Sequence, residues 1–306
     1  MTQNKRTDLA VELQEGAARE IPGVRRWEQA LAAGWQCTWI RVKTPEAARA
    51  LGKPCGTYCT LQGEDLATQS RAQLHRFAEE AAPVFWEWEA LRRAERVLVV
   101  GLGNRAITPD AFGPRVCEGL FVTRHLRAEL PFLRQEGYRE VSAMVPGVMG
   151  VTGMQTREMV RGVVEQTRPD LVIAVDALAS ERMRRVGSVL QVSDTGIQPG
   201  SGLGSAPAAI DEAYLGVPVL AVGMPMVTYA SVIAEDLIRT AFRGKAEEGD
   251  IAALAQAVGT ADGAEWIVTP KHIDLLVRKA AEAVSMLLNL ALHPAFDAEA
   301  AALLCE

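Results

Sequence analysis

From Val97 onward, short uninterrupted apolar runs alternate with longer amphipathic stretches. Short apolar runs bounded by turn residues are typical of strands that are covered on both faces of a sheet. The runs that we interpret as strands span residues 97–102, 140–145, 171–175, 187–192 and 217–222. The stretches with helical periodicity span residues 110–130, 157–166, 227–242 and 272–292. Strands that alternate with helices predict an α/β fold with three layers, α/β/α, and a largely parallel central sheet.

The first third of the chain has a different pattern. Residues 35–42 and 56–61 alternate between apolar and polar side chains, which predicts two strands that pair with each other. A helical turn between them ends at Gly52, and a longer amphipathic helix with one interruption is expected over residues 71–94. Residues 6–12 also alternate, and they are predicted to form an edge strand or a flexible arm.

Composition and charge exclude several classes of protein. Hydrophobic residues make up 49% of the chain and charged residues 23%, which is ordinary for a globular protein. The net charge of −6 and the lack of a basic cluster argue against nucleic-acid binding. No apolar run approaches the ~20 residues that span a bilayer, and the N-terminus has no apolar signal core, so we expect a cytoplasmic protein without a membrane partner. Residues 1–306 are treated as one domain, in which the polar, alanine-rich segment 245–263 is an insert.

Cysteine and histidine residues are too scattered to indicate a metal site. The five cysteines are odd in number, and the spacing of Cys55 and Cys59 is a poor zinc signature. We interpret them as reduced structural thiols and expect neither a metal nor a cofactor. Serine or cysteine catalysis has less support, because no G-x-S-x-G motif occurs and no histidine is near Ser193, Ser201 or Cys117 in sequence.

The first predicted strand of the repeating part leads directly to a carboxylate. Gly101 and Gly103 permit a sharp turn and a close backbone approach after the strand 97–102. Pro109 suits the first position of a helix, so Asp110 is expected at the helix entrance. The carboxyl edge of a parallel sheet is where open α/β folds bind their ligands.

Other aspartates follow other predicted strands. Asp176 appears where the run 171–175 ends, and Asp194 ends the run 187–192. Asp170 is a weaker candidate of the same kind. If these strands are parallel neighbours, their carboxyl ends meet at one edge of the sheet and bring the aspartates together.

Two aspartates in a partly dry cleft cannot both ionise easily. One keeps its proton and acts as an acid while the other activates water, which can hydrolyse an amide without a metal or a covalent intermediate. A capping role stays open for each aspartate, because aspartates after strands also cap helices. A nucleotide-binding module is a further alternative, although segment 194–204 lacks the lysine of a P-loop and the turn 101–106 lacks the third glycine of a dinucleotide fold.

Several blocks of sequence together resemble the germination protease family, the endopeptidases that degrade small acid-soluble spore proteins. Two of them, PGVMGVTGMQT and DTGIQPGSG, are the most specific. The blocks occur in family order at residues 6–12, 97–114, 141–180, 192–205, 215–227 and 269–294. The resemblance implies a fold related to hydrogenase-maturation proteases, an atypical aspartic mechanism, a zymogen that trims its own N-terminus, and a homotetramer. It further implies small acid-soluble spore proteins as substrates and a location in the spore core.

The resemblance also assigns residues to roles. The catalytic aspartate of the family's TPD motif falls on Asp110, and its partner in the motif VDALA falls on Asp176. Asp194 becomes a neighbour that binds substrate or braces the site. The same group of supporting positions comprises Gly103, Asn104, Thr195 and Gly196. In the related maturation proteases the two aspartate positions hold a metal, so a metal-assisted endopeptidase is the alternative.

The N-terminal block resembles a substrate. A substrate site of the family has Thr-Glu, an aliphatic residue, Ala and a small residue before Glu, and residues 7–12 are TDLAVE. We therefore expect self-cleavage between Asp8 and Leu9, with residues 1–8 as a short propeptide.

Overall fold

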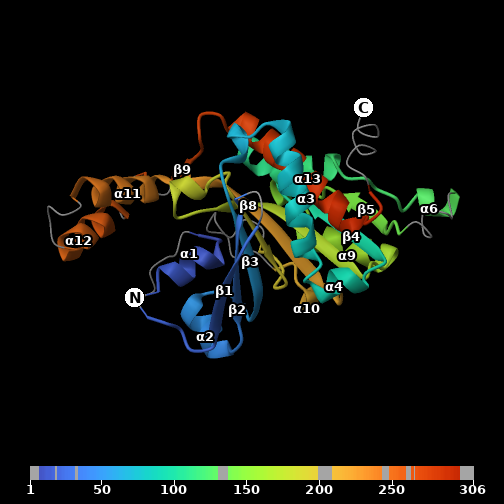
Figure 1. The fold of residues 1–306 in the computed structure, drawn as a ribbon, viewed down its shortest axis with the longest axis horizontal. Coiled ribbons are helices and arrows are strands. Elements are labelled where there is room, and N and C mark those ends of the chain that lie inside the picture. Colours follow the sequence, from blue (N-terminus) through green and yellow to red (C-terminus); the bar gives the residue numbers. More distant parts are fainter. Residues whose placement is uncertain are drawn as a thin grey trace.

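The computed structural model describes residues 7–17, 19–31, 34–129, 137–198, 209–242, 248–259, 263–264 and 266–296. Within these residues nine strands form one sheet in the order β1-β2-β3-β7-β8-β6-β4-β5, with β9 paired to β8 (Figure 1). The strands are β1 (Val24–Ala30), β2 (Gln36–Val42), β3 (Gly56–Gln62), β4 (Arg96–Gly101), β5 (Glu140–Met144), β6 (Leu171–Ala179), β7 (Val189–Ser193), β8 (Val219–Tyr229) and β9 (Ile267–Val268).

The sheet has a parallel half and an antiparallel half. Strands β5, β4, β6 and β8 are parallel neighbours, as the strand–helix alternation predicts. Strand β7 then pairs antiparallel with β8, and β3, β2 and β1 continue antiparallel to the edge. The expected pairing of β2 with β3 is confirmed. The N-terminal strands therefore extend the same sheet, and they do not form a separate layer.

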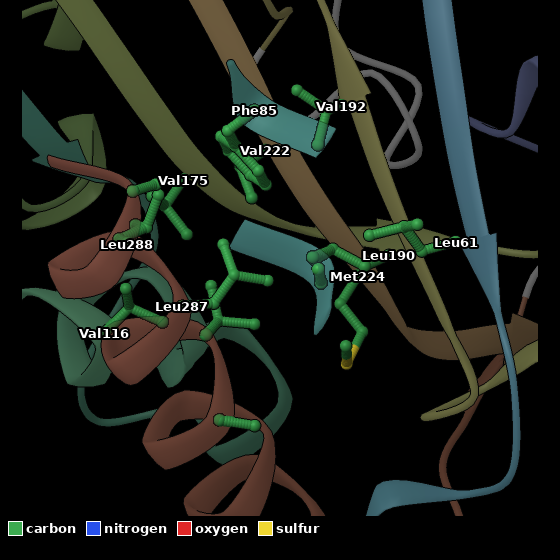
Figure 2. Close-up of a cluster of buried hydrophobic side chains, with 14 of the residues drawn as sticks. Leu61, Phe85, Val116, Val175, Leu190, Val192, Val222, Met224, Leu287 and Leu288 are labelled. Atoms are coloured by element: carbon green, nitrogen blue, oxygen red, sulfur yellow. The ribbon is translucent and has the colours of Figure 1, made fainter. Parts of the chain in front are cut away.

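Helices cover both faces of the sheet, which confirms the three-layer α/β/α class. Helices α3 (Arg71–Phe85), α5 (Phe112–Glu118) and α13 (Ile273–Leu292) pack on one face. Figure 2 shows Leu287 and Leu288 of α13 in one cluster with Val175 and Val222 of the sheet. On the opposite face α9 (Thr156–Thr167) and α10 (Glu212–Leu215) cover the parallel strands. Helices α1 (Ala10–Glu15) and α2 (Pro45–Leu51) cover the antiparallel half on that face.

The remaining helices are shorter or lie at the ends of the molecule. They are α4 (Glu89–Arg93), α6 (Leu126–Glu129), α8 (Met149–Thr152), α11 (Ala230–Phe242) and α12 (Glu248–Gly259), with single 3₁₀ turns η1 (Leu66–Thr68), η2 (Thr108–Ala111) and η3 (Met183–Arg185). Helix α12, which occupies most of the expected insert 245–263, packs beside α11 at one end of the molecule (Figure 1). Residues 245–247 and 260–262 of that segment lie outside the described residues. None of the helices in the described part of the chain is long and apolar enough to cross a membrane.

Two local predictions were wrong, and one strand was missed. The helix expected over 110–130 is divided into three short elements: η2, α5, which ends before Gly119, and α6. Residues 10–15 form α1 and not a strand, because they bury their apolar side chains against β2 and β3. Strand β1 was not predicted, because it lies at the sheet edge with six of its seven residues exposed and so shows no alternation.

Candidate active site

A cavity of about 530 Å³ opens on the face of the sheet that carries α1 and α9. Its floor is formed by β6, β7 and β8, and the small residues Ala221 and Gly223 of β8 are among those that line it. Asp110 and Asp176 both line it, so the structure brings together the two aspartates that the sequence singled out. Asp8, from the N-terminal segment, lines the same cavity.

Glycines bring Asp110 to the cavity. After β4 the chain turns at Gly103, whose φ of +115° favours glycine, and a Cβ there would overlap the carbonyl oxygen of Asp110. A Cβ at Gly113 would overlap the carbonyl oxygens of Leu102 and Val175, so α5 begins directly against the end of β4 and the middle of β6. The backbone N–H of Asn104 donates to Asp110 Oδ2 at 2.6 Å and fixes the carboxylate. The expected supporting positions Gly103 and Asn104 thus act on Asp110 and do not themselves line the cavity.

Asp176 lies inside β6, which continues for three residues beyond it to Ala179, and not at the strand end as the sequence suggested. The strand extends because β8 pairs with it over the same length. The Asp176 side chain is buried, with 6% of the residue exposed, and its Oδ1 accepts a 2.9 Å hydrogen bond from the N–H of Ala177. A carboxylate in the middle of a buried strand cannot be explained as a helix cap.

The two carboxyl groups differ in their surroundings. Burial raises the pKa of Asp176 well above its usual range, and the negative charge of Asp110 raises it further. Burial also raises the pKa of Asp110, while the Asn104 N–H opposes that rise by stabilising the carboxylate. Asp110 is only half-buried, so we expect its carboxyl group to ionise before that of Asp176. Such a division can supply one general base and one general acid in one cavity.

The N-terminal segment lies against the end of β6. The Asp8 N–H donates to the carbonyl of Ala179 at 3.1 Å, and the Ala179 N–H donates to Asp8 Oδ2 at 2.9 Å. Leu9 is fully buried in the cluster formed by α1, α2 and β3. Three residues after Leu9, the Glu12 carboxylate accepts from Ser180 Oγ at 2.7 Å and pairs with buried Arg185 at 3.3 Å.

Asp194 does not join the other two aspartates. It follows β7, which is antiparallel to β8, so the expectation of parallel neighbouring strands was wrong for this aspartate. The Asp194 carboxylate instead accepts a 2.7 Å hydrogen bond from the N–H of Thr57 at the start of β3. Asp194 is not among the residues that line the cavity. Thr195 and Gly196, which follow it, do line the cavity.

We expect Asp194→Ala to change stability more than catalysis. Loss of the acceptor for the Thr57 N–H should lower the free energy of unfolding by ~1 kcal/mol, with peptide cleavage within ~3-fold of the wild type. Asp194→Asn, which keeps an acceptor oxygen, is the matched control and should show a smaller loss of stability. Urea denaturation and a cleavage assay measure both effects. A loss of activity far larger than the loss of folded protein would show that Asp194 takes part in catalysis.

The chain is similar to known proteins over most of its length. The sequence profile described as "Germination protease" matches residues 2–248. The chain belongs to the germination protease family. A germination protease of Caldanaerobacter subterraneus subsp. tengcongensis is 40% identical over 306 residues, which cover 94% of each chain. That of Clostridium perfringens is 35% identical over 95% of this chain and 96% of its own length. That of Bacillus subtilis is 43% identical over 76% of this chain and 66% of its own.

Membership of the family makes the chain a peptidase of spore germination. Among solved structures, a [NiFe] hydrogenase maturation protease of Thermococcus kodakarensis KOD1 overlaps it with a TM-score of 0.37 and 16% identity, over 67% of this chain and 96% of that one. An overlap of this size supports no conclusion about the site. Within the described ranges, no group of three His, Cys, Asp or Glu side chains is placed to hold a metal ion.

Two polar residues of the site carried no signal in the sequence. Lys53 follows Gly52, whose left-handed backbone ends α2 and turns the chain toward the cavity. Burial lowers the pKa of the Lys53 ammonium group, and the nearby Asp8 carboxylate partly offsets this lowering. Gln191 lies in the middle of β7, 7% exposed, where an apolar run favours a purely structural reading. A buried glutamine that faces a cavity is recognisable only after the register of the sheet is known.

Proposed function

We propose that the chain is an endopeptidase that begins the degradation of small acid-soluble spore proteins during germination, with Asp110 and Asp176 as its acid–base pair. The observation that carries this proposal is the meeting of the two carboxyl groups in one cavity with Asp8 of a substrate-like segment. The family contributes the peptidase activity and the link to germination. Burial raises the pKa of both carboxyl groups, and that of Asp176 well above its usual range, which supports the aspartic mechanism.

The reaction needs one water molecule and two proton transfers. Asp110, as the carboxylate, removes a proton from water while the water oxygen forms a bond to the carbonyl carbon of the peptide. Asp176, as the carboxylic acid, gives its proton to the amide nitrogen as the C–N bond breaks. The products are a new carboxyl group and a new amine, and exchange with solvent returns each aspartate to its starting state. General acid–base assistance of this kind contributes ~10²–10⁴ in rate.

The same site is proposed to act on the chain's own N-terminus. Asp8 and Leu9 flank the bond that the family substrate pattern selects, and Asp8 lies in the cavity while Leu9 is fully buried beside it. The intact segment thereby fills the site, as expected of a zymogen. Assembly into a homotetramer and a location in the spore core complete the proposal.

Autoprocessing gives a defined product, and we expect active protein to begin at Leu9. Intact-mass measurement and N-terminal sequencing of protein incubated at 25 °C test this directly. Added small acid-soluble spore protein should be cut in the same kind of sequence, after Glu in Thr-Glu-aliphatic-Ala segments. Active protein that retains Met1 or Thr2 would refute the autoprocessing step.

Removal of metal ions with a chelator distinguishes the aspartic mechanism from a metal-assisted one. Activity should survive exhaustive dialysis against EDTA, because the proposed acid and base are both carboxyl groups of the chain. Loss of activity on chelation and its return with an added divalent cation would instead support the metal-assisted alternative.

A further inference from the structure

Two side chains from distant parts of the sequence donate to the same backbone carbonyl. Lys53 Nζ lies 2.8 Å from the carbonyl oxygen of Asp8, and Gln191 Nε2 lies 3.1 Å from it. Gln191 Oε1 also accepts from the N–H of Ala10 at 2.7 Å, so one amide group holds the backbone on both sides of Leu9. The carbonyl so held belongs to the bond between Asp8 and Leu9.

The register of the sheet places these donors relative to the aspartates. Gln191 of β7 and Asp176 of β6 are both level with Gly223 of the intervening strand β8. They therefore share one row and one face of the sheet, two strand spacings or roughly 10 Å apart. Lys53 enters the same cavity from the loop after α2. The carbonyl oxygen is thus approached by two donors in the cavity that contains both carboxyl groups.

Docking of the N-terminal segment does not by itself require these two donors. Two backbone hydrogen bonds to Ala179, the burial of Leu9 and the ion pair of Glu12 with Arg185 already hold the segment. An ammonium group that is partly withdrawn from water has a desolvation cost, and the Asp8 carboxylate and the neutral carbonyl offset only part of it. The same ammonium group would be stabilised far more if that oxygen became negatively charged.

We propose that Lys53 and Gln191 are catalytic residues that bind the carbonyl oxygen of the peptide bond being cut and stabilise the charge it acquires. This assignment rests on the proposed function above. When the water oxygen bonds to the carbonyl carbon, the π electron pair of the C=O bond moves onto the oxygen, which then accepts from Lys53 Nζ and Gln191 Nε2. When the C–N bond breaks, that pair re-forms the carbonyl, and the leaving nitrogen takes the proton of Asp176. The distances of 2.8 and 3.1 Å suit such donors.

The test uses the full chain and its own Asp8–Leu9 bond, so that no separate substrate has to enter the site. The first-order rate constant of cleavage is measured by mass spectrometry for Lys53→Met, which removes the donor, and for Gln191→Glu, which replaces Nε2 with an acceptor oxygen. Lys53→Arg keeps a cationic donor, and Lys43→Met removes an exposed lysine at the end of β2 as the matched control. Hydrogen exchange of the Ala10 amide reports in parallel whether the segment stays docked.

We expect Lys53→Met and Gln191→Glu each to lower the rate constant of cleavage by ~10²–10³-fold. Protection of the Ala10 amide from hydrogen exchange should stay within ~10-fold of the wild type. Lys53→Arg should recover part of the rate, and Lys43→Met should leave it unchanged. The inference is overturned if both variants cleave at the wild-type rate while Asp176→Asn is inactive, which would leave the proposed function standing. The inference is also overturned if the rate constant of cleavage falls only in proportion to the loss of Ala10 amide protection. The two donors would then act only in docking the N-terminal segment. Wild-type protein that does not cleave itself, or Asp176→Asn protein that cleaves normally, would reject the proposed function and the inference together.

Discussion

Asp176→Asn is expected to abolish peptide cleavage while making the protein more stable at neutral pH. Asparagine matches the shape of the protonated carboxyl group but cannot give up a proton, so the rate should fall by ~10²–10⁴ or more. The burial and the nearby Asp110 charge that raise the pKa of Asp176 also disfavour its ionised form in the folded state. Removal of the ionisable group removes this unfavourable contribution.

The pH dependence of stability has a definite sign. A carboxyl group with a raised folded-state pKa holds its proton in the folded protein when the unfolded chain has already lost it. The contribution of Asp176 to the wild-type free energy of unfolding therefore falls as pH rises from its unfolded pKa toward its folded one. The Asn variant lacks that fall, so the two proteins should have equal stability near pH 4 and differ increasingly above it, as measured by urea denaturation across pH.

Asp170→Asn is the matched control at the other end of β6. Asp170 precedes the strand and binds the guanidinium of Arg96 at 2.7 Å, which lowers its pKa. A group with a lowered pKa stabilises the folded state above its unfolded pKa, so Asp170→Asn should lose stability at pH 7 and retain activity. Asp176→Asn protein with normal cleavage, or with the same stability change as Asp170→Asn, would contradict the role assigned to Asp176.

Arg185→Met is expected to cause the largest loss of stability. Arg185 and Glu12 have side chains only 2% and 1% exposed and lie 3.3 Å apart, with a second ion pair from Arg185 to Glu15 at 2.8 Å. Removal of Arg185 leaves the Glu12 carboxylate buried with hydrogen bonds but no cation, and breaking a buried ion pair in this way lowers the free energy of unfolding by ~3–5 kcal/mol. The free energy of unfolding in urea measures the loss. The same change should loosen the N-terminal segment, since Glu12 is part of it.

Arg182→Met provides the comparison at an exposed ion pair. Arg182 lies 3.3 Å from the same Glu15, but its side chain is 40% exposed, so water already screens the pair. Arg182→Met should lower the free energy of unfolding by less than ~1 kcal/mol. The double variant Glu12→Gln with Arg185→Met should be more stable than Arg185→Met alone, because no uncompensated charge remains. Equal losses in the two single arginine variants would show that burial of the Arg185 pair contributes nothing.

The sequence determined the elements of the parallel half and the catalytic candidates within them. Strands β4, β5, β6 and β8 and helices α9 and α13 lie where their periodicity predicts, because each buries a continuous apolar run or face. Gly103 and Asp110 were recognisable because a glycine turn before a helix entrance is a local pattern. The substrate-like segment around Asp8 and Leu9 was likewise visible in the order of its residues.

Only the tertiary structure decided which of these residues meet. Whether β7 ran parallel or antiparallel to β8 depended on long-range pairing. Asp194 is not among the lining residues although Ser193 and Thr195 on either side of it are, because its carboxylate is turned to the Thr57 N–H of β3. The same register placed Gln191 level with Asp176, and a loop 123 positions before Asp176 in the chain brought Lys53 to the Asp8 carbonyl. Local patterns report which face of an element is buried, but contacts between residues distant in sequence are set by how strands pair and helices pack. The raised pKa of Asp176 is a consequence of that packing, because burial and the charge of Asp110 exist only in the folded protein.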